Sequence, residues 1–211
     1  MKIPLSLSAL LLVSISSAGS INFDDSSVSI GSILSTQYSG LGVTFSPNAL
    51  AGAGGPTGDW ATNTDLTIVS STGGDVGGLG TPSLVSGLLL RSFNGWLGED
   101  GDASFAINFA GGITDISMDF AGISTPASSR IFAFDASNNL LASVAASGTG
   151  QRTLSLSGLA TATKVVVTPG DFFDWVGIDN INFTPAAVPE PTTMAALGLG
   201  ALAMLRRRKK A

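Results

Sequence analysis

Hydrophobic and polar residues alternate in short runs through the middle of the chain, from about residue 20 to residue 184. A period of two places successive side chains on opposite faces of an extended strand. The runs are separated by Gly, Ser, Asn and Pro, which favour turns. The pattern recurs in residues 21–24, 43–45, 66–68, 105–109, 116–120, 132–134, 153–157, 164–168 and 178–183. It predicts an all-β fold, an antiparallel two-sheet sandwich of roughly ten strands with a jelly-roll-like topology.

One run departs from the alternation and predicts a different environment. Val165, Val166 and Val167 are consecutive β-branched residues, which is typical of a strand buried on both faces. Residues 51–58 and 73–82 are rich in glycine and predict surface loops. The body contains no internal repeat, so we expect one folded domain over residues 19–184.

The N-terminus has the three parts of an export signal. Lys2 precedes an apolar run, Leu5–Ile15, which ends in the small residues Ser16, Ser17 and Ala18. This order predicts a helical signal peptide over residues 1–18 that signal peptidase removes. The alternative is a buried first helix, and the run is too short for a comfortable membrane anchor.

The C-terminal segment, residues 185–211, also has a distinctive order. A Pro/Ala linker and a Pro-Glu-Pro triplet precede an uncharged run over 192–205, and five cations follow at 206–210. The run predicts a short transmembrane helix, about 21 Å long at 1.5 Å per residue. Cations stay on the cytoplasmic side, so the body would lie outside. The alternative, a helix packed on the domain, leaves the five adjacent cations unexplained.

These C-terminal residues resemble the PEP-CTERM sorting signal of Gram-negative bacteria. The resemblance rests on Pro189, Glu190 and Pro191, on the apolar helix, and on the cations that begin with Arg206, Arg207 and Arg208. It implies processing by an exosortase after transient anchoring in the inner membrane. It further implies a final place at the cell surface or in the extracellular matrix, in bacteria that make exopolysaccharide and biofilm.

The body resembles, more weakly, the sandwich domains of exported PEP-CTERM proteins. Residues 21–25 and 37–45 are similar to the opening of such domains, and residues 178–183 are similar to their last strand. These domains are themselves similar to galactose-binding-like and other lectin-type jelly rolls. The resemblance implies a fold and not a ligand, because such sandwiches host many functions.

Composition and charge exclude several function classes. The chain has 211 residues with no Cys and no His, which removes thiol nucleophiles, Cys/His zinc sites and Ser-His-Asp catalysis. Between residues 19 and 187 there are four basic and fourteen acidic residues, a net charge of −10. Phosphate groups would repel this body, so we expect no nucleic-acid partner.

Aspartates at the two ends of the body suggest a calcium site. Alternation places Ile21, Phe23 and Asp25 on one face of the first strand, and Asp179 with Ile181 and Phe183 on one face of the last. If the two strands are neighbours, four oxygen-bearing side chains come together: Asp24, Asp25, Asp179 and Asn180. An all-oxygen cluster suits Ca²⁺. The alternative is that Asp24 and Asp25 bind turn amides while Asp179 is solvated.

Acidic residues beside tryptophans suggest a second candidate site. A glycine-rich turn carries Glu99, Asp100 and Asp102 close to Trp96, and Trp60 follows an aspartate in another loop. Aromatic platforms with nearby carboxylates are suited to sugar rings and hydroxyls. The alternatives are a solvated hairpin tip and tryptophans that pack in the core.

Together these patterns predict an exported structural or adhesive protein associated with extracellular polysaccharide, and not an enzyme. A calcium-dependent carbohydrate-binding module is the alternative. A glycoside-active enzyme is third, since carboxylate pairs are the catalytic groups that remain.

Overall fold

The computed structural model describes residues 17–49, 66–72, 84–91, 104–170 and 176–187. These residues belong almost entirely to one compact unit, Ser17–Ala186. The predicted C-terminal helix, the predicted glycine-rich loops and nearly all of the predicted signal peptide lie outside the described residues. Within the described ranges, no helix is both long and apolar enough to cross a bilayer.

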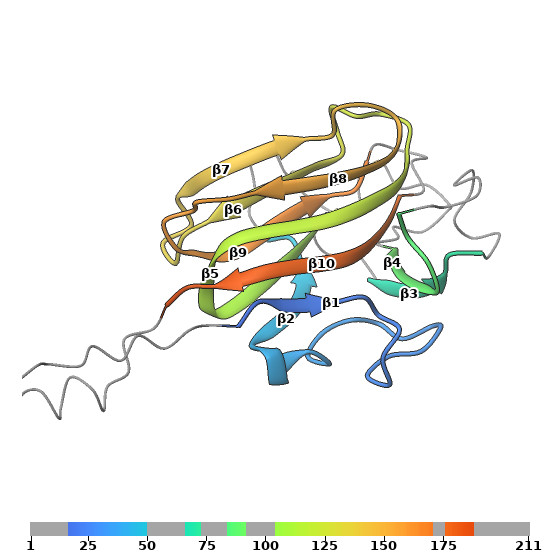
Figure 1. Cartoon of the computed structure of the whole chain (residues 1–211), viewed down its shortest axis with the longest axis horizontal. Coiled ribbons are helices and arrows are strands. Elements are labelled where there is room, and N and C mark those ends of the chain that lie inside the picture. Colours follow the sequence, from blue (N-terminus) through green and yellow to red (C-terminus); the bar gives the residue numbers. More distant parts are fainter. Residues whose placement is uncertain (1–16, 50–65, 73–83, 92–103, 171–175, 188–211) are drawn as a thin grey trace, which may run out of the picture. The chain divides into compact units, whose positions relative to one another are not determined.

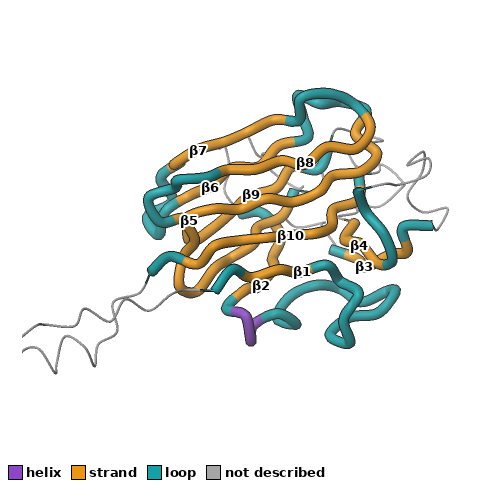
Figure 2. Tube along the Cα trace, in the orientation of Figure 1, coloured by secondary structure: helices purple, strands orange, loops and turns teal. Residues whose placement is uncertain are grey.

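The described chain is built from antiparallel strands, with one short 3-10 helix, η1 (Ser39–Leu41) (Figure 2). The strands are β1 (Gly19–Ile21), β2 (Val43–Pro47), β3 (Thr67–Ser70), β4 (Leu88–Arg91), β5 (Phe105–Ile123), β6 (Arg130–Phe134), β7 (Leu140–Ala145), β8 (Gly150–Leu156), β9 (Ala162–Thr168) and β10 (Gly177–Pro185). The prediction of an all-β antiparallel sandwich is therefore confirmed.

The long strand β5 joins the two layers (Figure 1). Its first half pairs with β2 and β9, and its second half pairs with β8 and β10. The register shifts between Asn108 and Ile113, near Gly112, whose φ is +71°. A Cβ at Gly112 would collide with Thr161, so the bend depends on glycine. Segments 105–109 and 116–120, which the alternation separates, are thus parts of one strand.

The alternation identifies the core correctly over much of the chain. Phe105, Ile107 and Phe109 share the main core with Ile116, Met118 and Phe120 of the second half of β5. Val165, Val166 and Val167 are all fully buried, as their consecutive positions predict. Val165 and Val167 face the main core, whereas Val166 joins a second cluster with Ala106, Phe132 and Phe134. The two phenylalanines of β6 therefore lie on the face opposite to the main core.

The first and last strands of the body are neighbours. β1 pairs antiparallel with β10, and Ile21 lies opposite Ile181. Two local irregularities of the backbone change the faces on which the side chains of these two segments were expected to lie. Phe23 has φ +60°, so β1 ends before it. A bulge around Asn180, whose φ is +51°, shifts the register of β10 against β5.

Because of the bulge, Asp179 lies on a different face of the sheet from Ile181 and Phe183, so the predicted shared face is wrong. Ile178 pairs with Phe120 and lies in the main core, so the next residue points to the outer face. Ile181 and Phe183, beyond the bulge, face the core again. Asp179 therefore does not share a face with them.

Candidate functional site

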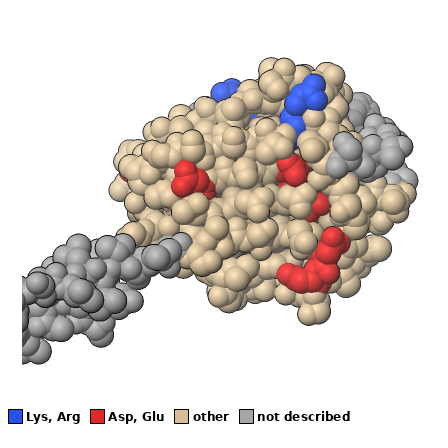
Figure 3. All heavy atoms as spheres, viewed as in Figure 1, with Lys and Arg blue, Asp and Glu red and all other residues tan. Residues whose placement is uncertain are grey.

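The candidate site is a group of carboxylates on the outer face of β10 and β5. Asp179 on β10 lies directly opposite Asp119 on β5. Asp24 approaches from the segment after β1, and Asp25 follows it. Figure 3 shows acidic side chains at several places on this face of the molecule, with the largest group toward its lower right, while basic side chains lie toward the upper margin.

Asp179 is buried although it lies on the outer face. It is 1% exposed, because the segment that leads into β4 covers it. Its Oδ1 accepts a hydrogen bond from the backbone N–H of Asn180 at 2.7 Å, and its Oδ2 accepts one from Ser86 at 3.3 Å. The predicted alternative of a solvated Asp179 is thus wrong.

The surroundings of Asp179 favour its protonated form. Burial raises the pKa of Asp179 to about 6, and the negative charges of Asp24 and Asp119 add to this effect. The backbone N–H groups of Asn180 and Ser86 act in the opposite direction, since they stabilise the carboxylate. Desolvation outweighs the two hydrogen bonds, so Asp179 titrates in a range that ordinary aspartates do not reach.

Asn180 and Asp24 fasten the segment before β4 to the sheet. The Asn180 side chain donates to Leu84 O at 2.8 Å and to Asp119 Oδ2 at 3.0 Å. Asp24 Oδ1 accepts from the backbone N–H of Leu88 at 2.8 Å. Gly87, just before Leu88, has φ +63°, and a Cβ at this position would collide with the Asp24 carboxylate. Residues 84–88 are therefore held by side chains from three parts of the chain, Gln151 of β8 included.

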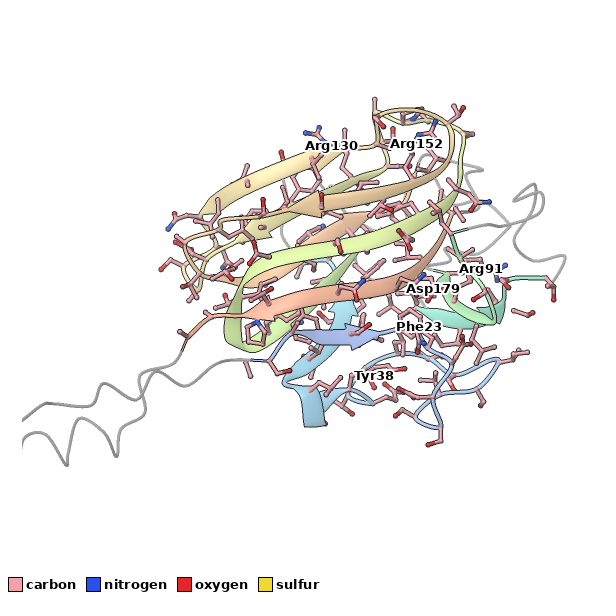
Figure 4. The ribbon with its side chains drawn as sticks, viewed as in Figure 1. Phe23, Tyr38, Arg91, Arg130, Arg152 and Asp179 are labelled. Atoms are coloured by element: carbon pink, nitrogen blue, oxygen red, sulfur yellow. The ribbon has the colours of Figure 1, made fainter. Side chains whose placement is uncertain are left out.

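Tyr38 lies beneath these carboxylates with its hydroxyl unsatisfied. The side chain is 3% exposed, and its hydroxyl makes no close hydrogen bond among the described residues, although the Asp25 carboxylate lies near enough to interact with it. Its ring packs edge-on against Phe23 at 5.9 Å and against Phe45 at 6.2 Å. Burial, followed by the charge of nearby Asp25, raises the pKa of Tyr38. Figure 4 shows Asp179, Phe23 and Tyr38 following one another from β10 toward η1.

Asp25 binds a turn amide, which is the predicted alternative to metal binding. It is exposed, and its Oδ1 accepts from the backbone N–H of Ser27 at 2.7 Å, as in an Asx turn. Among the described residues, no three acidic side chains lie close enough to form a metal-binding group. Asp24, Asp179 and Asn180 likewise have protein partners, so an ion would have to compete with these hydrogen bonds.

Two members of the site escape sequence reasoning. Asp119 occupies an ordinary outward position between Met118 and Phe120, and only the register of β10 makes it the neighbour of Asp179. Tyr38 is the only tyrosine of the chain, which is the one signal in the sequence that singles it out. The other predicted site residues lie outside the described residues: Trp60, Trp96, Glu99, Asp100, Asp102, Pro189, Glu190, Pro191, Arg206, Arg207 and Arg208.

The C-terminal segment is identified by comparison with known protein families. The model of the PEP-CTERM protein-sorting motif matches this chain just after the end of β10. Residues 187–209 are a PEP-CTERM protein-sorting motif. The motif implies an exported chain that an exosortase recognises and processes. It contains the Pro-Glu-Pro triplet and all but one of the five cations that carried the predicted resemblance.

Several solved structures are distantly similar to this chain. The K2 cleaved adhesin domain of Lys-gingipain is 13% identical with a TM-score of 0.46, over 80% of this chain and 99% of its own. A Stig cyclase from Fischerella is 12% identical with a TM-score of 0.44, over 82% and 100%. The family 32 carbohydrate-binding module of C. perfringens NanJ, solved with galactose, is 14% identical with a TM-score of 0.33, over 57% and 94%. TM-scores this low support no conclusion about this chain. No curated protein matches the chain.

Proposed function

We propose that this chain is a non-catalytic surface or matrix protein, exported and then processed by an exosortase, with a structural or adhesive role. The PEP-CTERM sorting motif at residues 187–209 carries this proposal. The β-sandwich supports it, because every strand of the described chain ends before the motif begins. Cleavage at the motif would therefore leave the whole sandwich in the released or transferred product.

The chemistry of the body agrees with an extracellular place. Residues 19–187 carry a net charge of −10 and no cysteine. We therefore expect this body neither to bind nucleic acid nor to carry out a thiol-dependent reaction. The anionic body would also be repelled by the anionic lipid surface of the cytoplasmic leaflet. We infer that the sandwich is in contact with extracellular polysaccharide.

The sorting motif is tested by replacing Pro189, Glu190 and Pro191 with alanine in a strain that has an exosortase. We expect the wild-type chain to reach the cell surface without its C-terminal segment. The variant should stay in the inner membrane and still end at Ala211. Mass spectrometry of the C-terminus and cell fractionation measure both results. Glu99→Ala is the matched control, because Glu99 is the only other glutamate.

Two outcomes would contradict the proposal. One is a wild-type protein that is recovered from the surface with Ala211 intact. The other is a triple variant that is processed and located as the wild type is. Polysaccharide hydrolysis by the purified chain that disappears on replacing a single acid would instead favour the glycoside-active enzyme.

A calcium-dependent carbohydrate-binding module is the second candidate, favoured by the unsatisfied Tyr38 hydroxyl beneath several carboxylates. Asp24, Asp25, Asp179 and Asn180 remain the predicted ligands. An ion there would neutralise carboxylates that otherwise repel one another. The ion would also place a positive charge near the buried hydroxyl of Tyr38.

Calorimetric titration with Ca²⁺ tests this candidate. We expect heat of binding and a higher melting temperature for the wild type, and neither for Asp25→Ala. Asp135→Ala is the control, because Asp135 lies in the turn after β6, far along the chain from the site. A wild type that shows neither heat nor a change in melting temperature would end the calcium hypothesis. A glycan array with and without Ca²⁺ then tests sugar binding.

A further inference from the structure

Four neighbouring strands share an outer surface of small polar side chains. β1 pairs with β10, β10 with β5, and β5 with β8, and Figure 1 shows them side by side on the near side of the molecule. One row of residues that lie directly opposite one another crosses all four strands: Ser20, Asn182, Ser117 and Ser155. Two aspartates of β5, Asp115 and Asp119, lie two residues to either side of this row. These six residues are called the polar face below.

The polar face is accessible to a ligand. Ile116 and Met118 lie in the main core, so the residues between and beside them on β5 point outward. Ser20, Asn182 and Ser155 are exposed, and the three residues of β5 are partly exposed. The two aspartates are roughly 13 Å apart along the strand, at 3.4 Å per residue. A ligand that lies along β5 can therefore reach both carboxylates and the row between them.

The two aspartates of the polar face have only neutral hydrogen-bond partners among the described residues. Asp115 accepts from the Thr114 hydroxyl at 2.8 Å and from the Gly158 N–H at 3.0 Å. Asp119 accepts from a threonine hydroxyl of β8 and from the Asn180 side chain. The Thr114 hydroxyl and the Gly158 N–H lower the pKa of Asp115, so its carboxylate is charged at neutral pH. Both carboxylates can accept further hydrogen bonds, since each oxygen has two lone pairs.

The composition of the polar face argues against several kinds of partner. It has no apolar or aromatic side chain, whereas protein interfaces depend on buried aromatic and aliphatic anchors. The four strands carry one cation, Arg152, which by alternation lies on the same side of β8 as the core residue Leu154. In the view of Figure 3, basic side chains lie only toward the upper margin, so phosphate groups find no partner over the polar face. A ligand that is rich in hydroxyl groups and positively charged complements this surface.

We propose that the polar face binds an extracellular polysaccharide whose amino sugars carry free, protonated amines. This inference rests on the proposed contact with extracellular polysaccharide and names its chemical kind. The net charge of −10 over residues 19–187 repels acidic polysaccharides. The ammonium groups of amino sugars would pair with Asp115 and Asp119, while sugar hydroxyls would bond with the serines and Asn182. Because the polar face has no aromatic platform, binding depends on charge and on repeated contacts along the polymer.

Calorimetric titration of the full chain in a non-ionic detergent tests the charge requirement. The probes are an oligomer of glucosamine, its N-acetylated form and an oligomer of a uronic acid, at a pH at which the amines are protonated. A chelator is present, so the result does not depend on the calcium hypothesis. We expect binding of the glucosamine oligomer alone, lost at high salt. The N-acetylated oligomer is the matched control, because acetylation removes the charge and keeps the hydroxyl groups.

Two pairs of variants locate the binding surface. Asp115→Asn should bind the glucosamine oligomer about fivefold more weakly, the upper range for one exposed ion pair. Asp135→Asn, which removes a partly exposed carboxylate from the turn after β6, should bind as the wild type does. Ser155→Lys should abolish binding, because it places a cation in the row of the polar face. Ser137→Lys, which places the same charge on an exposed serine in the turn after β6, should keep it.

The inference is overturned if the glucosamine oligomer does not bind, if its N-acetylated form binds equally well, or if the uronic acid oligomer binds better. Unchanged affinity in Asp115→Asn or Ser155→Lys, or an equal loss in their controls, would overturn it as well. If a variant fails to fold, the comparison of the three oligomers on the wild type decides. Equal binding of the N-acetylated oligomer would remove the charge requirement and leave the proposed contact with polysaccharide standing. Failure of the proposed export and processing is measured separately, by the C-terminus and the location of the chain.

Discussion

Replacing Phe23 with alanine lowers the free energy of unfolding by about 3–5 kcal/mol, the range for truncating a buried phenylalanine. Phe23 is fully buried, and its ring lies 5.9 Å from Tyr38 and 6.4 Å from Phe45. The truncation would open a cavity where the N-terminal segment meets the core. Urea unfolding followed by circular dichroism measures the change, with an unchanged m-value as evidence that the fold is kept.

Ile30→Ala is the control for the Phe23 substitution. Ile30 lies in the same N-terminal segment but is 66% exposed, so its truncation should change the free energy of unfolding by less than about 0.5 kcal/mol. A loss below about 1 kcal/mol for Phe23→Ala would mean that the segment after β1 does not contribute to the core as described.

Raising the pH from 4 to about 6 destabilises the metal-free protein. Asp179 has a folded-state pKa of about 6, whereas an unfolded aspartate titrates near 4. The folded state therefore binds more protons between these values, and its stability falls as the pH rises. The contribution is fully present below pH 4 and lost above pH 6. Its size is on the order of 3 kcal/mol, because each pKa unit corresponds to about 1.4 kcal/mol.

Asp179→Asn should remove this slope, because asparagine does not titrate. Asp135→Asn is the control and should keep it, since hydrogen bonds from Asn139 lower the pKa of Asp135 and move its titration below the window. Urea unfolding at several pH values, with a chelator present, measures the slope. Wild-type stability that is constant or rises between pH 4 and 6 would contradict the buried state of Asp179.

Much of the fold could be predicted from local patterns, and the failures have identifiable causes. Alternation places Phe105, Ile107 and Phe109 correctly, because each side chain's burial follows from its neighbours in the same strand. It fails at Asp179, because the bulge at Asn180 inverts the faces within a few residues. It also divides β5 in two, since Gly111 and Gly112 read as a turn although the strand continues through them.

The candidate site was predictable only in part. The pairing of β1 with β10, which the calcium hypothesis requires, is present. Asp119 and Tyr38 were not predicted as members of the site, because each becomes a neighbour of Asp179 or Asp25 only through contacts between distant segments. The predicted roles of the loop tryptophans and their acidic neighbours stay predictions.

The sequence by itself determined the all-β class, the strand buried on both faces and the PEP-CTERM sorting motif. The burial of strand residues follows the period of two along each segment, and the sorting motif is defined by the order of its own residues. The local sequence is therefore enough for both. Only the tertiary structure decided that Asp179 is buried opposite Asp119 and that β5 spans both layers. Those features depend on register, bulges and edge order, which are set by the packing of the whole sandwich and not by any single segment.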